Sequence, residues 1–170
     1  LSIYRYLETL TRAIDGLVKK SSNVSLGYGS NSTYILADKI LKWAEKKRKM
    51  INLKVVTDDA LQDMSSMYKR ILVLYYIDGV KSSVIAELLG VSIRTYYRKK
   101  KIALDKFGLM LSKLGFDENF LKNNYGQEKW LMRVYDTCIE KDTITEENPM
   151  MNDGKAIIKN IICDLKHIKA

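Results

Sequence analysis

Cationic and aromatic side chains gather in one short stretch of the 170-residue chain. Five of the eight residues from Arg94 to Lys101 are cationic, and Tyr96 and Tyr97 lie among them. Guanidinium and ammonium groups donate strong hydrogen bonds to phosphate oxygens, and arginine can donate two bonds to one guanine edge. This stretch therefore has the chemistry needed to bind a polyanion.

The spacing of these residues predicts a helix with two different faces. At about 100° per residue, one face holds Tyr96, Ala103 and Phe107, which we expect to point into a core. A roughly opposite arc holds Arg94, Tyr97, Arg98 and Lys101. Long donors near the start of a helix can reach base edges in the major groove of duplex DNA.

The segment before this helix has the residues that a helix-turn-helix requires. Ala86 is small enough for two helices to cross, Gly90 can adopt positive φ in the turn, and Ser92 can cap the next helix. Apolar contacts across the pair are expected from Val84, Ile85, Leu88, Leu89 and Val91. We predict a helix-turn-helix over Lys81–Lys106, with an ordinary helical hairpin and a solvated charged face as the alternative.

Some side chains are better suited to phosphates than to bases. Lys99 and Lys100 flank the cationic arc, and the hydroxyls of Ser82, Ser83 and Thr95 can fix the register of the helix on the duplex. The predicted DNA-contacting residues are Ser82, Ser83, Ser92, Ile93, Arg94, Thr95, Tyr97, Arg98, Lys99 and Lys101.

Three segments of this region carry a family resemblance. Tyr68–Gly79, Ile85–Ser92 and Arg94–Arg98 resemble region 4 of the sigma-70 family, and still more the phage late-transcription activators of the ArpU and RinA kind. The resemblance covers about Ile51–Leu111, and Arg94, Tyr97, Arg98 and Lys101 match the family's DNA-reading positions. It implies recognition of a promoter element by the second helix and, for sigma factors, contact with RNA polymerase. The first 55 residues lack the aromatic and acidic pattern of sigma region 2.

The rest of the sequence predicts an all-α protein with few helix breakers. There are nine glycines and one proline, Pro149, and 46% of the residues are hydrophobic. Helices are expected over Ile3–Val18, Tyr34–Lys54, Thr57–Asp78 and Gln127–Lys141, and after a capping Asp153, with polar connections at Ser21–Ser32, Gly115–Gly126 and Asp142–Asn152. The second and third helices are expected to form an antiparallel pair, and Tyr135 to lie on the buried side of its helix.

The predicted organisation has three parts. Residues 1–32 form an N-terminal helix and linker, 33–114 a helix pair with the helix-turn-helix, and 115–170 a C-terminal helical extension. The apolar stripe of the last helix fits either packing on its own domain or formation of a homodimer. The basic run Lys46–Lys49 fits either a second phosphate contact or a solvated face.

Other chemistry has little support in the sequence. His167 is the only histidine, so no metal-ligand spacing exists, and Asp58-Asp59 and Glu146-Glu147 are neighbours that point apart. Cys138 and Cys163 are expected to be free thiols in a reducing compartment. We expect no enzyme activity, no metal or small cofactor, no membrane span and a cytoplasmic location.

A net charge of +9 and a pI near 9.4 favour a nucleic-acid partner. Three functional classes then compete. The chain could be an autonomous DNA-binding transcription regulator, a sigma-like subunit that requires RNA polymerase, or an architectural protein such as a small terminase-like phage packaging subunit.

Overall fold

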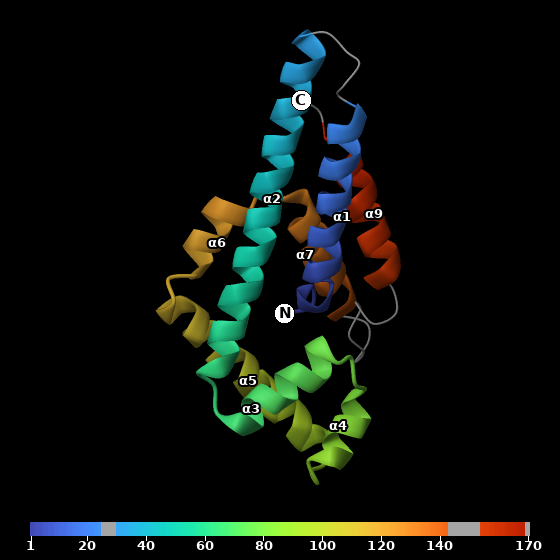
Figure 1. The fold of residues 1–170 in the computed structure, drawn as a ribbon. Coiled ribbons are helices and arrows are strands. Elements are labelled where there is room, and N and C mark those ends of the chain that lie inside the picture. The colour runs from blue at the N-terminus through green and yellow to red at the C-terminus, as the bar shows by residue number, and fades with distance from the viewer. Residues whose placement is uncertain (25–29, 143–153, 169–170) are drawn as a thin grey trace. The chain divides into compact units, whose positions relative to one another are not determined.

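The computed structural model describes residues 1–24, 30–142 and 154–168, and within these ranges every regular element is helical (Figure 1). The prediction of an all-α protein is confirmed. In chain order the helices are α1 Tyr4–Val24, α2 Ser30–Gln62, α3 Ser66–Leu72, the π-helical η2 Val73–Ile77, α4 Ser82–Leu88, α5 Ile93–Lys113, α6 Glu118–Tyr125, α7 Lys129–Asp142 and α9 Gly154–Lys166.

Contacts along the chain define two compact units. The first unit contains Leu1–Arg5 and Val55–Lys155, and the second contains Tyr6–Lys54 and Ala156–Ala170. α2 is a single helix whose residues contribute to both. The sequence predicted other boundaries, with parts at 1–32, 33–114 and 115–170. That division stays a prediction.

The second unit joins α1, α2 and α9. The indole Nε1 of Trp43 donates a hydrogen bond of 2.8 Å to the carbonyl oxygen of Leu165, and Lys47 pairs with Asp15 at 2.6 Å. The buried side chains of the second unit include Trp43, Leu7, Leu10, Ile14, Met50, Ile158, Ile161 and Leu165. The apolar stripe of α9 is therefore buried within its own unit.

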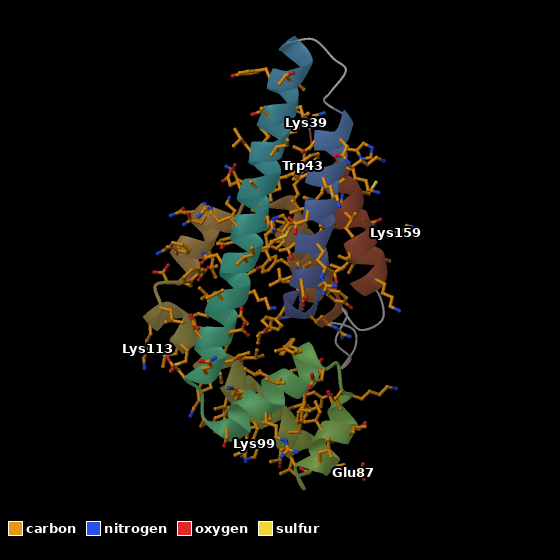
Figure 2. All side chains as sticks on the ribbon, in the orientation of Figure 1. Lys39, Trp43, Glu87, Lys99, Lys113 and Lys159 are labelled. Atoms are coloured by element: carbon orange, nitrogen blue, oxygen red, sulfur yellow. The ribbon has the colours of Figure 1, made fainter. Side chains whose placement is uncertain are left out.

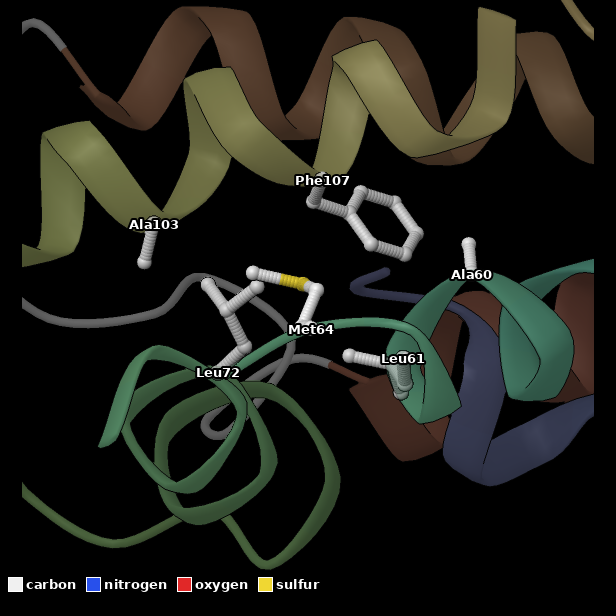
Figure 3. Close-up of a cluster of buried hydrophobic side chains, with 6 residues drawn as sticks. All are labelled: Ala60, Leu61, Met64, Leu72, Ala103 and Phe107. Atoms are coloured by element: carbon white, nitrogen blue, oxygen red, sulfur yellow. The ribbon is translucent and has the colours of Figure 1, made fainter. Parts of the chain in front are cut away.

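The core of the first unit lies between the end of α2, α3 and α5. Figure 3 shows Met64 and Leu72 pointing toward Ala103 and Phe107 of α5, with Ala60 and Leu61 from the last turns of α2 beside them. The spacing of Ala103 and Phe107 places both on one side of α5, as predicted. Burial of these apolar side chains fixes α5 against the preceding helices.

A second cluster holds the helix-turn-helix itself. It contains Ile71 and Tyr75 from α3 and η2, Ile85 and Ala86 from α4, and Tyr96 from α5. Leu89 and Val91 of the turn pack against this cluster from the side. The predicted crossing of the two helices at a small residue is confirmed, since Ala86 is only 4% exposed.

The break predicted between the second and third helices is wrong. α2 continues through Thr57–Asp59 to Gln62, and the chain breaks instead at Met64-Ser65 before α3. Val55, Val56 and Thr57 are all compatible with a helix, and the Asp58 carboxylate accepts a hydrogen bond from the Tyr4 hydroxyl instead of capping a helix. Only residues 57–62 of the expected third helix therefore belong to α2, and the rest of it forms α3 and η2.

Several other boundaries also differ from the predicted ones. α1 runs on to Val24 and α2 begins at Ser30, so both ends of the predicted linker Ser21–Ser32 are helical. Gly115–Gly126 holds α6, whose first turn is capped by Asp117 through a 2.7 Å hydrogen bond from the Phe120 amide. Tyr135 of α7 is 56% exposed, not buried. The expected loop beyond Asp142 and the cap at Asp153 lie outside the described residues.

Two glycines of the first unit should respond in opposite ways to replacement by alanine. Gly90 has φ of +62°, where a Cβ is unfavourable, whereas Gly108 lies inside α5 with open space around it. We expect Gly90→Ala to lower the free energy of unfolding by about 1–2 kcal/mol and Gly108→Ala to raise it by about 0.5–1 kcal/mol. Urea unfolding of both variants measures these changes in free energy. Equal effects of the two substitutions would contradict the left-handed turn at Gly90.

Candidate nucleic-acid interface

The turn between α4 and α5 is closed by a Schellman motif. The amide of Val91 donates to the carbonyl of Ala86 at 3.0 Å, and the amide of Gly90 donates to that of Glu87 at 2.9 Å. This pattern requires a left-handed residue, which Gly90 supplies. The turn therefore ends α4 sharply and redirects the chain into α5.

Ser92 caps the start of α5, as predicted. Its backbone is extended, and its Oγ accepts a hydrogen bond of 3.2 Å from the amide of Thr95. The same hydroxyl donates to the Oγ1 of Thr95 at 2.9 Å. A cap of this kind is worth about 1 kcal/mol and fixes where the helix begins.

The rotation of α5 about its axis decides which side chains face outward. Tyr96 and Ala103 are completely buried and Phe107 is 7% exposed. Arg94, Arg98 and Lys101 are exposed, and Tyr97 is half-buried between the two faces. The structure thus separates the predicted core face from the predicted cationic arc and brings the three cations onto one side of α5.

The electrostatics of this surface favour an anion. Residues 81–106 contain seven lysines and arginines against two carboxylates, Glu87 and Asp105. Within the part of the chain that the structure describes, Arg94, Arg98 and Lys101 form no ion pair with an acidic side chain. Their charges are therefore available to a ligand.

Ser82 and Tyr96 meet inside the helix-turn-helix. Neither the Ser82 Oγ nor the Tyr96 hydroxyl reaches solvent, and neither has a hydrogen-bond partner of good geometry among the described residues. Burial raises the pKa of Tyr96 to about 12, against a smaller lowering by the nearby Ser82 hydroxyl. The Ser82 hydroxyl thus lies away from the surface, whereas its neighbour Ser83 is exposed.

The remaining predicted contact residues lie around the cationic arc. Ile93 is 43% exposed at the first turn of α5, and Thr95 is half-buried with its hydroxyl bonded to Ser92. Lys99 is half-buried, its Nζ lies 3.3 Å from the Met67 sulfur, and Figure 2 labels it on the first unit.

Lys100 has a different environment from the one expected. Its Nζ lies 3.6 Å from the centre of the Tyr75 ring and 5.8 Å from those of Tyr76 and Tyr97. Tyr75 belongs to η2, and the centre of its ring lies 4.8 Å from that of Tyr76 with the two rings nearly perpendicular. This lysine therefore makes a cation–π contact within the unit, a role that its flanking position did not suggest.

Sequence reasoning overlooked Lys81, an exposed cation immediately before α4. Its position two residues before Ser83 was the available signal, since residues at the start of a helix are suited to contact phosphate. The arrangement at Lys100 had no such signal, because the ring beneath it, that of Tyr75, belongs to a separate element, the π-helical η2.

The comparison with protein families agrees with this geometry. Residues 54–106 match the family model described as Sigma-70, region 4, which spans the end of α2 through most of α5. The predicted resemblance to region 4 is confirmed for residues 54–106, whose helix-turn-helix is similar to that of this family. The comparisons with curated proteins and with solved structures find no match.

Two further findings concern other kinds of site. In the described ranges, no three metal-ligating side chains come together in a group that could hold a metal ion. None of the helices described has both the length and the apolar character to cross a membrane.

Replacement of Lys100 distinguishes an internal cation from a phosphate contact. We expect Lys100→Met to lower the free energy of unfolding by about 0.5–1 kcal/mol, because it removes the charge above the Tyr75 ring. The salt dependence of binding to duplex DNA should stay unchanged, whereas Lys101→Ala should reduce the log–log slope by about 0.9. A smaller slope for Lys100→Met would place this lysine on the phosphates after all.

The raised pKa values of two tyrosines predict that the fold loses stability at alkaline pH. Burial and the Asp58 carboxylate raise the pKa of Tyr4 to about 12, and burial raises that of Tyr96 to about 12. Unfolded phenols ionise near 10, so the unfolded chain releases protons first and the free energy of unfolding falls between about pH 10 and 12. Urea midpoints across this window should fall less steeply in Tyr4→Phe and Tyr96→Phe than in Tyr135→Phe, the exposed control.

Proposed function

We propose that the chain is a sequence-specific DNA-binding transcription regulator that places α5 in the major groove of duplex DNA. One observation carries the proposal: burial of Tyr96 and Ala103 turns Arg94, Arg98 and Lys101 outward together, without acidic partners among the described residues. A row of long donors on one face of an exposed helix is the arrangement that direct readout requires. The net charge of +9 supports a polyanionic partner.

Different side chains have different roles in this proposal. Arg94 and Arg98 lie in the first two turns of α5 and donate to base edges, most favourably to guanine. Tyr97 lies beside them and packs against a base or sugar. Phosphate contacts that fix the register come from Lys99, Lys101 and the exposed start of α4 at Lys81 and Ser83, with Ser92 and Thr95 holding the first turn.

The match to Sigma-70, region 4 favours a second candidate function. In this version the same helix reads a promoter element, but RNA polymerase supplies much of the affinity, as expected for a sigma-like subunit. The kinship with phage activators of the ArpU and RinA kind stays a prediction within either version. A packaging role would need a large ring, which the size of the protein in solution would reveal.

Selection of bound duplexes from a random DNA pool tests the proposal directly. We expect the wild-type chain to enrich one motif, and the Arg94→Ala, Arg98→Ala double variant to lose it with roughly 1–3 kcal/mol of binding free energy per arginine. Lys113→Ala removes an exposed cation at the far end of α5 and is the matched control, labelled in Figure 2. It should keep the motif.

The same experiment separates the two candidate functions. If the chain alone enriches no motif but does so after RNA polymerase is added, the polymerase-dependent version holds. If neither condition yields a motif and the double variant binds DNA as well as the wild type, α5 does not read DNA and both versions fail.

A further inference from the structure

The outward side of α2 carries apolar residues where a surface helix normally carries polar ones. Tyr34 is 80% exposed, Leu41 69% and Ile51 46%. On the opposite side, Trp43 and Met50 are buried in the second unit, and Figure 2 labels Trp43 on the side of α2 toward α1. The helix therefore has one buried apolar face and a second, exposed one.

The exposed residues repeat with the spacing of a coiled coil. The outer stripe consists of Tyr34, Ala37, Leu41, Ala44, Arg48 and Ile51, all of them exposed. Their separations alternate between three and four residues, which is the a and d pattern of a heptad. A helix packed on an irregular surface does not require this alternation, but a second helix does.

The residues beside the stripe have opposite charges on its two flanks. One flank, at the e positions, carries Asp38 and Glu45, which pair with lysines of the same helix, and Asp59, and it has no cation. The other flank, at the g positions, carries Lys47, which pairs with Asp15 of its own chain, and Lys54, and no carboxylate. In a parallel pair of identical helices the e flank of each copy faces the g flank of the other, whereas in an antiparallel pair each flank faces its own kind.

We propose that the outer stripe of α2 is the interface of a parallel homodimer, with α2 of a second copy as its occupant. The stripe is self-complementary in this arrangement, since Lys54 of one copy meets Asp59 of the other. Ala37 and Ala44 let the two backbones approach closely. Arg48 is the one charged member, and a single basic residue at an a position weakens the pair while opposing higher oligomers. This proposal is independent of the proposed function.

The mass in solution gives the first test. Sedimentation equilibrium of the full chain should give twice the chain mass of 19.6 kDa. Leu41→Glu should raise the dissociation constant roughly a hundredfold or more, because each dimer loses two buried leucines and gains two facing carboxylates. Leu109→Glu replaces an equally apolar, 55% exposed residue of α5 and should leave the dimer intact.

Cysteine cross-linking tests the orientation. In the parallel arrangement two copies of Ala44→Cys lie next to each other across the seam and should form a disulfide under mild oxidation. Lys39→Cys lies on another side of the same helix and should not, and the wild type controls for Cys138 and Cys163. A monomer at every concentration, a dimer that survives Leu41→Glu, or no cross-link at position 44 would each overturn the proposal.

Discussion

The burial of Tyr96 determines which side chains of α5 face outward. Its ring is completely buried among Ile71, Tyr75 and Ile85, so α5 cannot rotate about its axis without exposing it. Burying a ring of this size stabilises the fold by several times the thermal energy. The hydroxyl is buried without a partner of good geometry, and nothing in the structure explains why tyrosine stands there instead of phenylalanine. The position of this ring therefore decides that residues 94, 98 and 101 face outward.

The concentration of positive charge near α5 is a second constraint. Four consecutive cations, Arg98 to Lys101, repel one another, and a helix can direct only some of them toward one ligand. The structure separates them: Arg98 and Lys101 are exposed, while Lys100 lies over the ring of Tyr75. The π-helical turn changes the register of the side chains in this region, since it adds a residue to the turn. One cation thereby stabilises the unit and the others remain available for binding.

Local sequence signals made the helix-turn-helix predictable, whereas contacts between residues far apart in the sequence could not be predicted. Gly90, Ser92 and the buried face of α5 depend on backbone conformation and helical spacing, which a few neighbouring residues determine. The continuity of α2 was missed because Thr57-Asp58-Asp59 resembles a cap, and only the distant Tyr4 shows that Asp58 has another role. The bond from Trp43 to Leu165 joins residues that no local pattern relates. Of the candidate site, the arc on α5 was found, but the burial of the Ser82 hydroxyl and the position of Lys100 were not.

The oligomeric state affects how much affinity for DNA the chain would have without RNA polymerase. A single helix-turn-helix makes few phosphate contacts, and each contact weakens as the salt concentration rises, so a monomer would gain most from a partner such as RNA polymerase. A parallel pair of α2 helices would relate two recognition helices by a two-fold axis, because α2 continues at its C-terminal end into the unit that contains α5. Such a dimer would double the contacts and favour a palindromic site with half-sites about one helical turn apart, or a multiple of it. Symmetry would thus supply to an autonomous regulator the additional DNA contacts that RNA polymerase would supply to a monomer.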